Sequence, residues 1–373
     1  MTTDTVVDTI CRSIRDETGD LAELVDSAVR RIAPLATAAE RLRLQRDAMA
    51  RMAGLGQLED LVSDSEIDEV LVNGDEIWID RAGRIEPAGR LRGTSVEHLI
   101  ERILAPIGRR VDRTSPIVDA RLPSGARVCA VVPPVAVGGA SLSIRRFSDD
   151  IRPLDDFTDG SGIDLLRAIV AHRCNVIVCG ATSSGKTSLL AAMISLVDDV
   201  ERLLVLEDTA ELPCRAPHLV RLEARPASAD GVRSVPLGDL VRTALRLRPD
   251  RLVVGEVRSD ECLALVQAMN TGHDGSFSTC HANGPLDALL RLESLVLQAA
   301  PQWPLTAVRQ QLARSIDIII HVGRRGAVRR ILDVSEVVPP SLDGSLCPPA
   351  VRRIGGLDRD ELVVVGSLQR GRR

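Results

Sequence analysis

A glycine-rich segment that ends in lysine and threonine carries the most specific chemistry of this sequence. Residues 174–179 are a short apolar run, residues 180–187 have the sequence Gly-Ala-Thr-Ser-Ser-Gly-Lys-Thr, and an apolar helical pattern opens at Ser188. This order of strand, loop and helix is the P-loop pattern, in which backbone N–H groups and the positive end of the helix dipole bind phosphates. The sequence therefore predicts an ATPase that binds ATP and Mg²⁺. The predicted phosphate-binding residues are Gly180, Ala181, Thr182, Ser183, Ser184, Gly185, Lys186, Thr187 and Ser188.

Lys186 is the only lysine of the chain, although lysine and arginine together number 47. Arginine is a broad planar fork and lysine is a compact, strongly hydrated point charge, so the one spared position indicates a need for the small ammonium. In a P-loop the lysine reaches the β- and γ-phosphates, and the hydroxyl that follows it binds Mg²⁺. We therefore expect a catalytic role for Lys186 and a metal-binding role for Thr187.

Acidic residues follow two further apolar runs that predict strands. Glu207 and Asp208 follow residues 202–206, and Glu256 follows residues 251–255. Ligands of an open parallel sheet bind outside the carboxyl ends of its strands, so these acids are candidates for activating water and holding a metal. The alternative is that they cap helices. For Glu207 as a catalytic residue and Asp208 as a metal ligand both interpretations stay open, whereas Glu256 is the predicted general base.

Two of the six histidines lie in one segment, residues 271–283. We expect His273 and His281 to lie at the nucleotide, in a loop that responds to the γ-phosphate. A metal site that includes Cys280 is an alternative, but the spacing fits no standard zinc pattern.

Charge and composition restrict the class of partner. The net charge is −5 and aromatic residues make up 1%, which argues against direct contact with a nucleic acid through its phosphates or stacked bases. The eight cysteines include no CxxC pair. The first residues lack the apolar core of a signal peptide, and no apolar run approaches the roughly 20 residues of a transmembrane segment. We expect a cytoplasmic protein with reduced thiols.

The chain divides into four segments by pattern. Residues 1–56 have apolar residues at helical spacing and predict a helical N-terminal extension. Residues 57–147 alternate short strand patterns with turn formers, which predicts a small α+β domain. Residues 148–160 are acidic, with a proline and a glycine, and predict a linker. Residues 161–373 alternate strand and helix patterns, which predicts an α/β domain with a parallel sheet.

Together these features resemble the type II/type IV secretion ATPase superfamily, specifically its CpaF/TadA branch, over about residues 57–340. Residues 205–212 look like the family's Asp box, residues 246–258 like its atypical Walker B motif, and residues 271–283 like its His box. The upstream segments 111–123 and 143–147 look like parts of its N-terminal domain. One departure is Ser183, which stands where the branch usually has glycine. No tetracysteine module is present, in contrast to some type II secretion relatives.

The resemblance implies a RecA-like P-loop NTPase domain, a smaller PAS-like N-terminal domain and a homohexameric ring with ATP between the two domains. It also implies that arginines of the N-terminal domain reach the γ-phosphate. The candidates, which the sequence does not rank, are Arg121, Arg127 and Arg145.

The implied function is a motor that powers pilus assembly or protein secretion, peripheral at the cytoplasmic membrane, with a polytopic inner-membrane platform protein as partner. The main alternative is a conjugation-type or nucleic-acid translocation ATPase, because a RecA-like fold serves both. A small-molecule kinase with the same P-loop is a third possibility, which the separate N-terminal domain and the Asp and His boxes disfavour.

Overall fold

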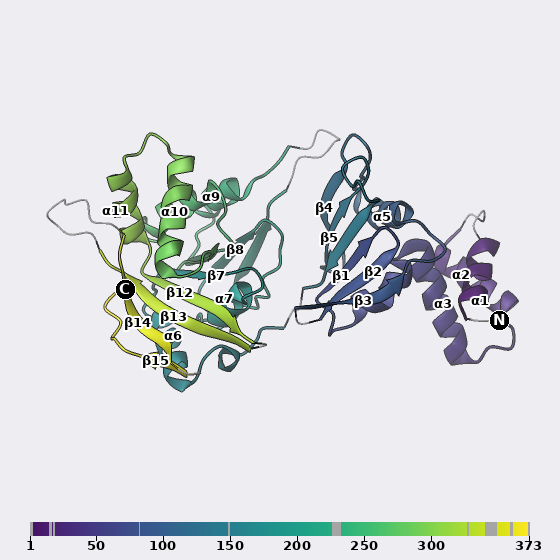
Figure 1. The fold of residues 1–373 in the computed structure, drawn as a ribbon, viewed down its shortest axis with the longest axis horizontal. Coiled ribbons are helices and arrows are strands. Elements are labelled where there is room, and N and C mark those ends of the chain that lie inside the picture. Colours follow the sequence, from purple (N-terminus) through teal and green to yellow (C-terminus); the bar gives the residue numbers. More distant parts are fainter. Residues whose placement is uncertain are drawn as a thin grey trace. The chain divides into compact units, whose positions relative to one another are not determined.

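The structure, a computed structural model, describes residues 3–14, 17, 19–81, 83–147, 150–225, 233–326, 328–339, 349–358 and 361–371 (Figure 1). The chain forms two compact units, Met1–Phe147 and Ser148–Arg373. Each has its own apolar cores, so each is described separately. Within the ranges given above, no helix combines the length and apolar character that a membrane-spanning helix needs.

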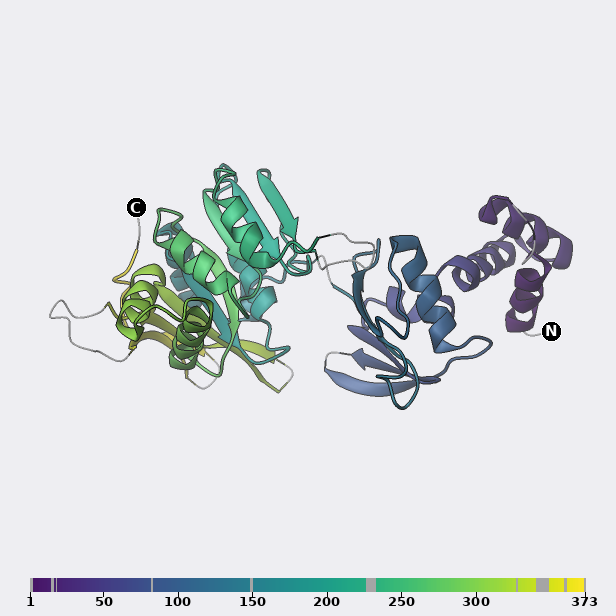
Figure 2. The same ribbon diagram turned by 90° about the horizontal axis from the view of Figure 1, so that it is seen from above.

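Three helices open the N-terminal unit: α1 (Thr3–Ser13), α2 (Leu21–Ile32) and α3 (Ala38–Ala53). The Asp20 side chain accepts hydrogen bonds from two backbone N–H groups at the start of α2, and Thr37 forms a capping box with Glu40 at the start of α3. Val7, Val29 and similar apolar residues share one small core. Figure 2 shows the three helices, in purple, as one cluster. The predicted helical character of this extension agrees with these elements.

The rest of the N-terminal unit is a six-stranded antiparallel sheet in the order β3-β2-β1-β6-β5-β4, with helix α5 packed against it. Burial alternates along β1, β5 and β6, as expected for strands with one face in the core. The elements are η1 (Gly56–Leu58), α4 (Glu59–Ser63), β1 (Glu69–Asn73), β2 (Glu76–Arg81), β3 (Arg84–Arg90), α5 (Val96–Leu104), η2 (Ala105–Ile107), β4 (Ile117–Arg121), β5 (Arg127–Val131) and β6 (Ser141–Arg145). The helix and sheet content fits the α+β expectation, and the PAS-like likeness stays a prediction.

The C-terminal unit is built on a nine-stranded sheet in the order β15-β14-β13-β12-β7-β11-β10-β8-β9. The strands from β12 to β9 are parallel, and β13, β14 and β15 extend the sheet as antiparallel neighbours. The strands are β7 (Val176–Gly180), β8 (Leu203–Glu207), β9 (Leu219–Glu223), β10 (Arg251–Val254), β11 (Phe277–His281), β12 (Ile318–Arg325), β13 (Val328–Val337), β14 (Val351–Asp358) and β15 (Glu361–Val364). The predicted α/β class with a parallel sheet is confirmed.

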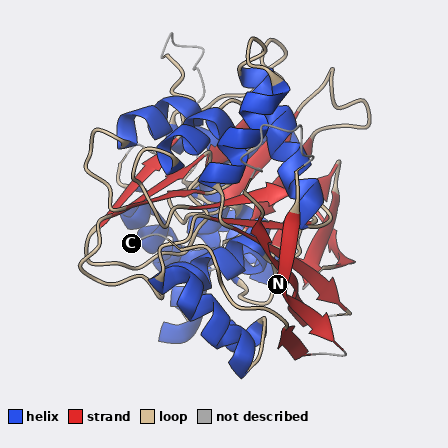
Figure 3. Cartoon of the chain, turned by 90° about the vertical axis from the view of Figure 1, so that its left-hand side faces the viewer, coloured by secondary structure: helices blue, strands red, loops and turns tan. Residues whose placement is uncertain are grey.

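Helices cover both faces of this sheet (Figure 3). Ile177 and Cys179 of β7 face the core formed with α8 to α11, whereas Val176 and Val178 face the core formed with α6 and α7. Both faces of β7 are therefore dry, which explains its continuous apolar sequence. The helices are η3 (Leu154–Asp156), α6 (Gly160–Ala171), α7 (Lys186–Ile194), α8 (Leu237–Ala244), α9 (Glu261–Met269), α10 (Pro285–Ala299) and α11 (Leu305–Ser315).

The segment predicted as a linker, residues 148–160, is partly a packed element of the C-terminal unit. It contains η3, and Leu154 and Phe157 are buried in the core that α6 and α7 share. The acidic composition predicted a linker, but the two buried apolar residues pack its second half onto the C-terminal unit.

The last described residues bind the amino-terminal edge of the parallel strands. Arg370 Nη2 lies 2.9 Å from Asp317 Oδ1, and Asp317 Oδ2 accepts a hydrogen bond of 2.8 Å from the backbone N–H of Asn175. Arg370 Nη1 donates to three backbone carbonyl oxygens, those of Ala313, Ile316 and Val337. One arginine thus joins the C-terminal segment to the beginnings of β7 and β12.

We expect Arg370→Ala to lower the free energy of unfolding of the C-terminal unit by about 3–5 kcal/mol, because Asp317 would keep a buried charge without its partner. Urea unfolding followed by Trp303 fluorescence in a Trp78→Phe background measures this unit. Gln369→Ala, which removes an exposed neighbouring side chain, is the control and should change little. An unchanged midpoint for Arg370→Ala would contradict the anchoring role.

Candidate functional site

The site is positioned by the carboxyl ends of parallel strands. Gly180 at the end of β7 is in register with His281 at the end of β11, and Val254 at the end of β10 is in register with Leu206 of β8. Because these strands are parallel neighbours, the residues that follow them meet at one edge of the sheet. The P-loop, Glu207 and Glu256 are therefore brought to the edge at which the sequence placed them.

Two residues of the loop adopt left-handed backbone conformations. Gly185 has a φ of +102° and Ser183 a φ of +58°. Glycine adopts such angles without strain, but a serine there costs about 1–2 kcal/mol. The position at which Ser183 departs from the branch is thus one where the backbone favours glycine, and the surrounding loop must hold the serine in this conformation.

Lys186 opens α7 and is 93% buried, since only 7% of its surface is exposed. Its Nζ donates to the carbonyl oxygens of Gly180 at 3.1 Å and Ala181 at 2.9 Å, and lies 3.4 Å from His281 Nδ1. Burial lowers the pKa of the ammonium, while the negative charge of Glu256 acts in the opposite direction. The compact cation is enclosed by its own loop, and its catalytic role stays a prediction.

His281 lies between Lys186 and Glu256. Because a lysine ammonium only donates, His281 Nδ1 is the acceptor in the contact with Lys186, and the ring proton is on Nε2. Nε2 lies 3.0 Å from Glu256 Oε1. Burial lowers the pKa of His281, with the neighbouring cation Lys186 acting in the same direction and Glu256 opposing it. The neutral imidazole thus lies between the lysine of the loop and the predicted base.

Glu256 has two different carboxylate oxygens. Oε2 accepts hydrogen bonds from Arg258 Nε at 3.0 Å and Nη2 at 2.5 Å. Oε1 is buried without a hydrogen bond within the described part of the chain, since its approach to His281 lacks hydrogen-bond geometry. A buried acceptor of this kind at the edge of a phosphate loop fits a water molecule as its partner. Sequence reasoning did not single out Arg258, although its place two residues after Glu256 in an extended segment was a signal.

Glu207 is bound on both oxygens. Oε1 accepts from the backbone N–H groups of Glu211 at 2.9 Å and Leu212 at 2.7 Å, and Oε2 lies 3.1 Å from Arg221 Nη2. Burial raises the pKa of this carboxyl group, against the effect of the bonds just named. These contacts give Glu207 the geometry of a residue that fixes the loop after β8, and a catalytic role for it stays a prediction.

Thr187 and Asp208 are the predicted metal ligands. Thr187 is in the first turn of α7, and Asp208 is exposed directly after β8, so both lie at the edge that carries the phosphate loop. A hydroxyl and a carboxylate are hard oxygen donors, and Mg²⁺ is commonly held by one or two protein ligands together with nucleotide phosphates and water. The residues therefore fit Mg²⁺. Burial acts to lower the pKa of Arg258, but Glu256 and, to a smaller extent, the charge of Asp208 raise it above its usual value.

The structure separates the two predicted histidines. His273 precedes β11 by four residues, and its Nδ1 contacts the carbonyl oxygen of Ala268 at 3.2 Å. It therefore lies toward the amino end of the strand whose carboxyl end carries His281. Burial raises the pKa of the Cys280 thiol to about 11, which disfavours a thiolate ligand. Among the residues that are described, no group of three His, Cys, Asp or Glu side chains could hold a metal.

The three arginine candidates lie in one row of the N-terminal sheet. Arg121 of β4 is opposite Arg127 of β5, which is opposite Arg145 of β6. Like charges directly opposite one another destabilise a sheet. Asp119, 3.3 Å from Arg127, and the ring of Phe147, 5.5 Å from the Arg145 guanidinium carbon, offset part of this repulsion. The row continues with Glu69 of β1, which is opposite Arg145. The sequence alone did not predict this row, because strand register determines it.

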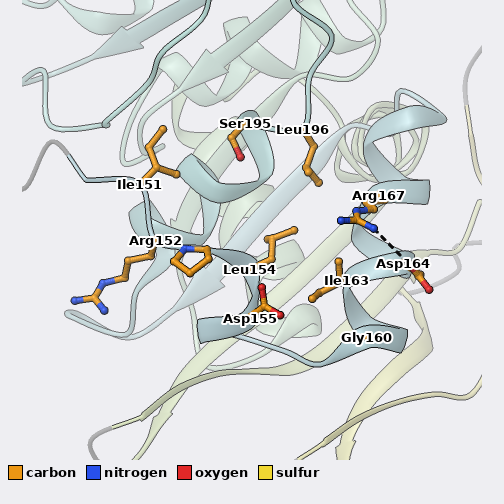
Figure 4. Close-up of a pocket in the computed structure, with 11 residues that line it drawn as sticks. Ile151, Arg152, Leu154, Asp155, Gly160, Ile163, Asp164, Arg167, Ser195 and Leu196 are labelled. Atoms are coloured by element: carbon orange, nitrogen blue, oxygen red, sulfur yellow. Dashed lines mark ion pairs between the residues drawn. The ribbon is translucent and has the colours of Figure 1, made fainter.

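A cavity of about 580 Å³ in the C-terminal unit lies away from the phosphate loop (Figure 4). Ser195 and Leu196, just past the end of α7, line it, whereas Lys186 is at the start of this nine-residue helix. Leu154 and charged side chains of both signs complete the wall, including Asp164 and Arg167. The cavity has no excess positive charge that would select a phosphate.

Comparison with known proteins shows the family of the chain. The model of the type II/IV secretion system protein family matches residues 51–330. A putative conjugal transfer protein of Mycobacterium tuberculosis is 40% identical over 298 residues, 75% of this chain and 83% of that protein. The probable conjugal transfer protein TrbB of Sinorhizobium fredii is 35% identical over 288 residues, 74% of this chain and 85% of that protein.

Among solved structures, the Legionella pneumophila ATPase DotB matches with a TM-score of 0.52 and 20% identity, over 84% of this chain and 80% of that chain. At this identity the match supports the fold. The helices α1 and α2 lie outside the range of the family model.

We expect Lys186→Arg to abolish ATP turnover as fully as Lys186→Ala, because the pocket between the Gly180 and Ala181 carbonyl groups holds a compact ammonium and not a planar fork. Phosphate release with Mg²⁺ and ATP measures this. Arg242→Lys, an exchange of the same two residue types on the exposed side of α8, is the control and should keep the wild-type rate. Retention of most of the rate by Lys186→Arg would show that the site tolerates the larger cation.

Proposed function

Because the chain belongs to the type II/IV secretion system protein family, we propose that it is an ATP-hydrolysing motor of a conjugation-type secretion system. The observation that carries the proposal is the group formed by Lys186, His281 and Glu256 at the carboxyl ends of β7, β11 and β10. This group joins the P-loop to a carboxylate whose buried Oε1 has no hydrogen bond to a described residue. Such a carboxylate is suited to accept a proton from the attacking water.

The proposed division of labour follows from the contacts. Lys186 and the backbone N–H groups of the loop hold the phosphates, and Thr187 and Asp208 hold Mg²⁺, which neutralises charge on the phosphate oxygens. Arg258 orients Glu256 through Oε2 so that Oε1 is left for water. Glu207 fixes the position of the segment that carries Asp208.

The choice of secretion system rests on the relatives. Two relatives that match about three quarters of the chain are named for conjugal transfer, which favours the conjugation-type interpretation over pilus assembly. Assignment to the CpaF/TadA branch stays a prediction that none of these relatives tests. The net charge of −5 still argues against direct contact with nucleic acid, so a membrane-bound protein of the transport apparatus is the expected partner.

The arginine row of the N-terminal unit is proposed to bind the terminal phosphate of the nucleotide. Arg121, Arg127 and Arg145 place three guanidinium groups on adjacent strands, and a multiply charged anion offsets their mutual repulsion. If ATP binds this row more tightly than ADP does, hydrolysis changes the preferred arrangement of the two units. A homohexamer of such chains, as the family resemblance implies, would turn these changes into movement of a partner at the cytoplasmic membrane.

Glu256→Gln tests the proposed chemistry. We expect phosphate release to fall on the order of 10²-fold or more while ATP binds with near-native affinity, because the amide keeps the shape but cannot accept the proton. Glu207→Gln is the matched comparison, and it should instead lower stability, since that carboxylate accepts three hydrogen bonds. Weak ATP binding by Glu256→Gln, with normal turnover at saturating ATP, would assign Glu256 to binding.

One set of measurements tests both the role of the arginine row and the assembly into a homohexamer. Light scattering with a non-hydrolysable ATP analogue and Mg²⁺ should detect homohexamers, and the ATPase rate per chain should rise with protein concentration. Arg145→Ala should lower that rate without unfolding the chain, since Arg145 is exposed at the end of β6. A monomer with a concentration-independent rate would exclude the motor and leave an ordinary P-loop enzyme.

A further inference from the structure

We propose that Arg329 of β13 binds the α- and β-phosphates of the nucleotide from the side of the loop opposite His281. The inference rests on the proposed function and adds to it a residue outside the family's motif segments. It is carried by the contact that the β12–β13 hairpin makes with both ends of the P-loop.

The hairpin runs beside the loop from its first residue. β12 is the parallel neighbour of β7, and their last register pair is His321 with Cys179. β12 then continues past the end of β7, so that a Cβ added to Gly180 would lie only 2.3 Å from the carbonyl oxygen of Val322. The backbone of β12 thus borders the loop where it begins.

Arg329 borders the loop where it ends. A Cβ added to Gly185 would lie 2.7 Å from Arg329 Cδ and 3.2 Å from Arg329 Nε. The positive φ of Gly185 favours glycine, and the arginine stem lies where a side chain at this position would begin. The same contact places the Arg329 guanidinium beside the backbone that leads into Lys186.

The positive charges of the hairpin indicate an anionic ligand. Arg324 of β12 is directly opposite Arg329 in the hairpin register, so two like charges lie side by side in the hairpin that borders the loop. An anion bound to the loop offsets that repulsion. Arg330, the next residue, points to the other face of the strand and donates from Nη1 to the carbonyl oxygen of Asp156 at 3.2 Å.

The position of Arg329 along the loop selects the phosphates. In a P-loop the backbone N–H groups cradle the α- and β-phosphates, whereas the lysine reaches the β- and γ-phosphates. Arg329 packs on Gly185, one residue before Lys186, and approaches from β13. His281 and Glu256, which belong to the γ-phosphate side, lie across the loop on β11 and after β10. Arg329 is therefore assigned to the part of the nucleotide that ATP and ADP share.

The test uses Arg329→Met in the full chain, because methionine keeps an unbranched stem over Gly185 and removes only the charge. Calorimetric titrations with Mg²⁺-ADP and with Mg²⁺-AMP-PNP should each show a loss of affinity of about tenfold or more, and by the same factor, as expected for one charge-assisted hydrogen bond. Arg330→Met removes the same charge one residue away, on the other face, and should bind both nucleotides like the wild type. Thermal unfolding confirms that each variant is folded.

Three outcomes would overturn the inference. Wild-type affinity of Arg329→Met for both nucleotides would remove the phosphate contact. A loss confined to AMP-PNP would place the contact at the γ-phosphate. A loss of nucleotide affinity in Arg329→Ala that is absent in Arg329→Met would show that Arg329 acts only by packing on Gly185. Lys186→Ala in the same titrations separates this inference from the proposed function. If both Lys186→Ala and Arg329→Met bind the nucleotides normally, the P-loop site itself is wrong. If Lys186→Ala loses affinity and Arg329→Met does not, only the role of Arg329 is wrong.

Discussion

The parallel register of β7 with β11 is the constraint on which the site depends. It places Gly180 opposite His281, and from that one pairing follow the contacts of the imidazole with Lys186 on one side and Glu256 on the other. Side chains alternate along a strand, so a slip of one residue would turn His281 into the core and break the connection. The dry packing on both faces of β7 holds the register, which means that the apolar cores specify the polar site.

Two glutamates at neighbouring strand ends show how environment separates similar residues. Glu207 accepts hydrogen bonds from two backbone N–H groups and pairs with Arg221, and it therefore stabilises the conformation of the loop after β8. Glu256 is held by Arg258 on one oxygen only, and the other oxygen stays available for a ligand. The difference arises because the loop after β8 directs backbone N–H groups back toward Glu207. The geometry of that loop determines their direction.

The sequence was sufficient for the features that local pattern determines. The P-loop, the parallel α/β class and the strand ends that carry Glu207 and Glu256 follow from short motifs and from apolar runs. The sequence could not rank Arg121, Arg127 and Arg145, because only the antiparallel register shows that they form one row. It also grouped His273 with His281, since residues eight apart in one segment look adjacent until a strand separates them. Arg329 was missed because its contact with Gly185 joins residues 144 positions apart.

The burial of the chain's single lysine has a consequence for chemical labelling. Arginine carries every other basic charge of the sequence apart from the histidines, so Lys186 is the only side chain with a primary amine, and it is enclosed by the loop that it serves. Amine-directed cross-linkers therefore find no lysine on the described surface of the folded protein. Covalent attachment of such a reagent to a lysine would therefore report that Lys186 has become accessible, which requires the loop around it to open.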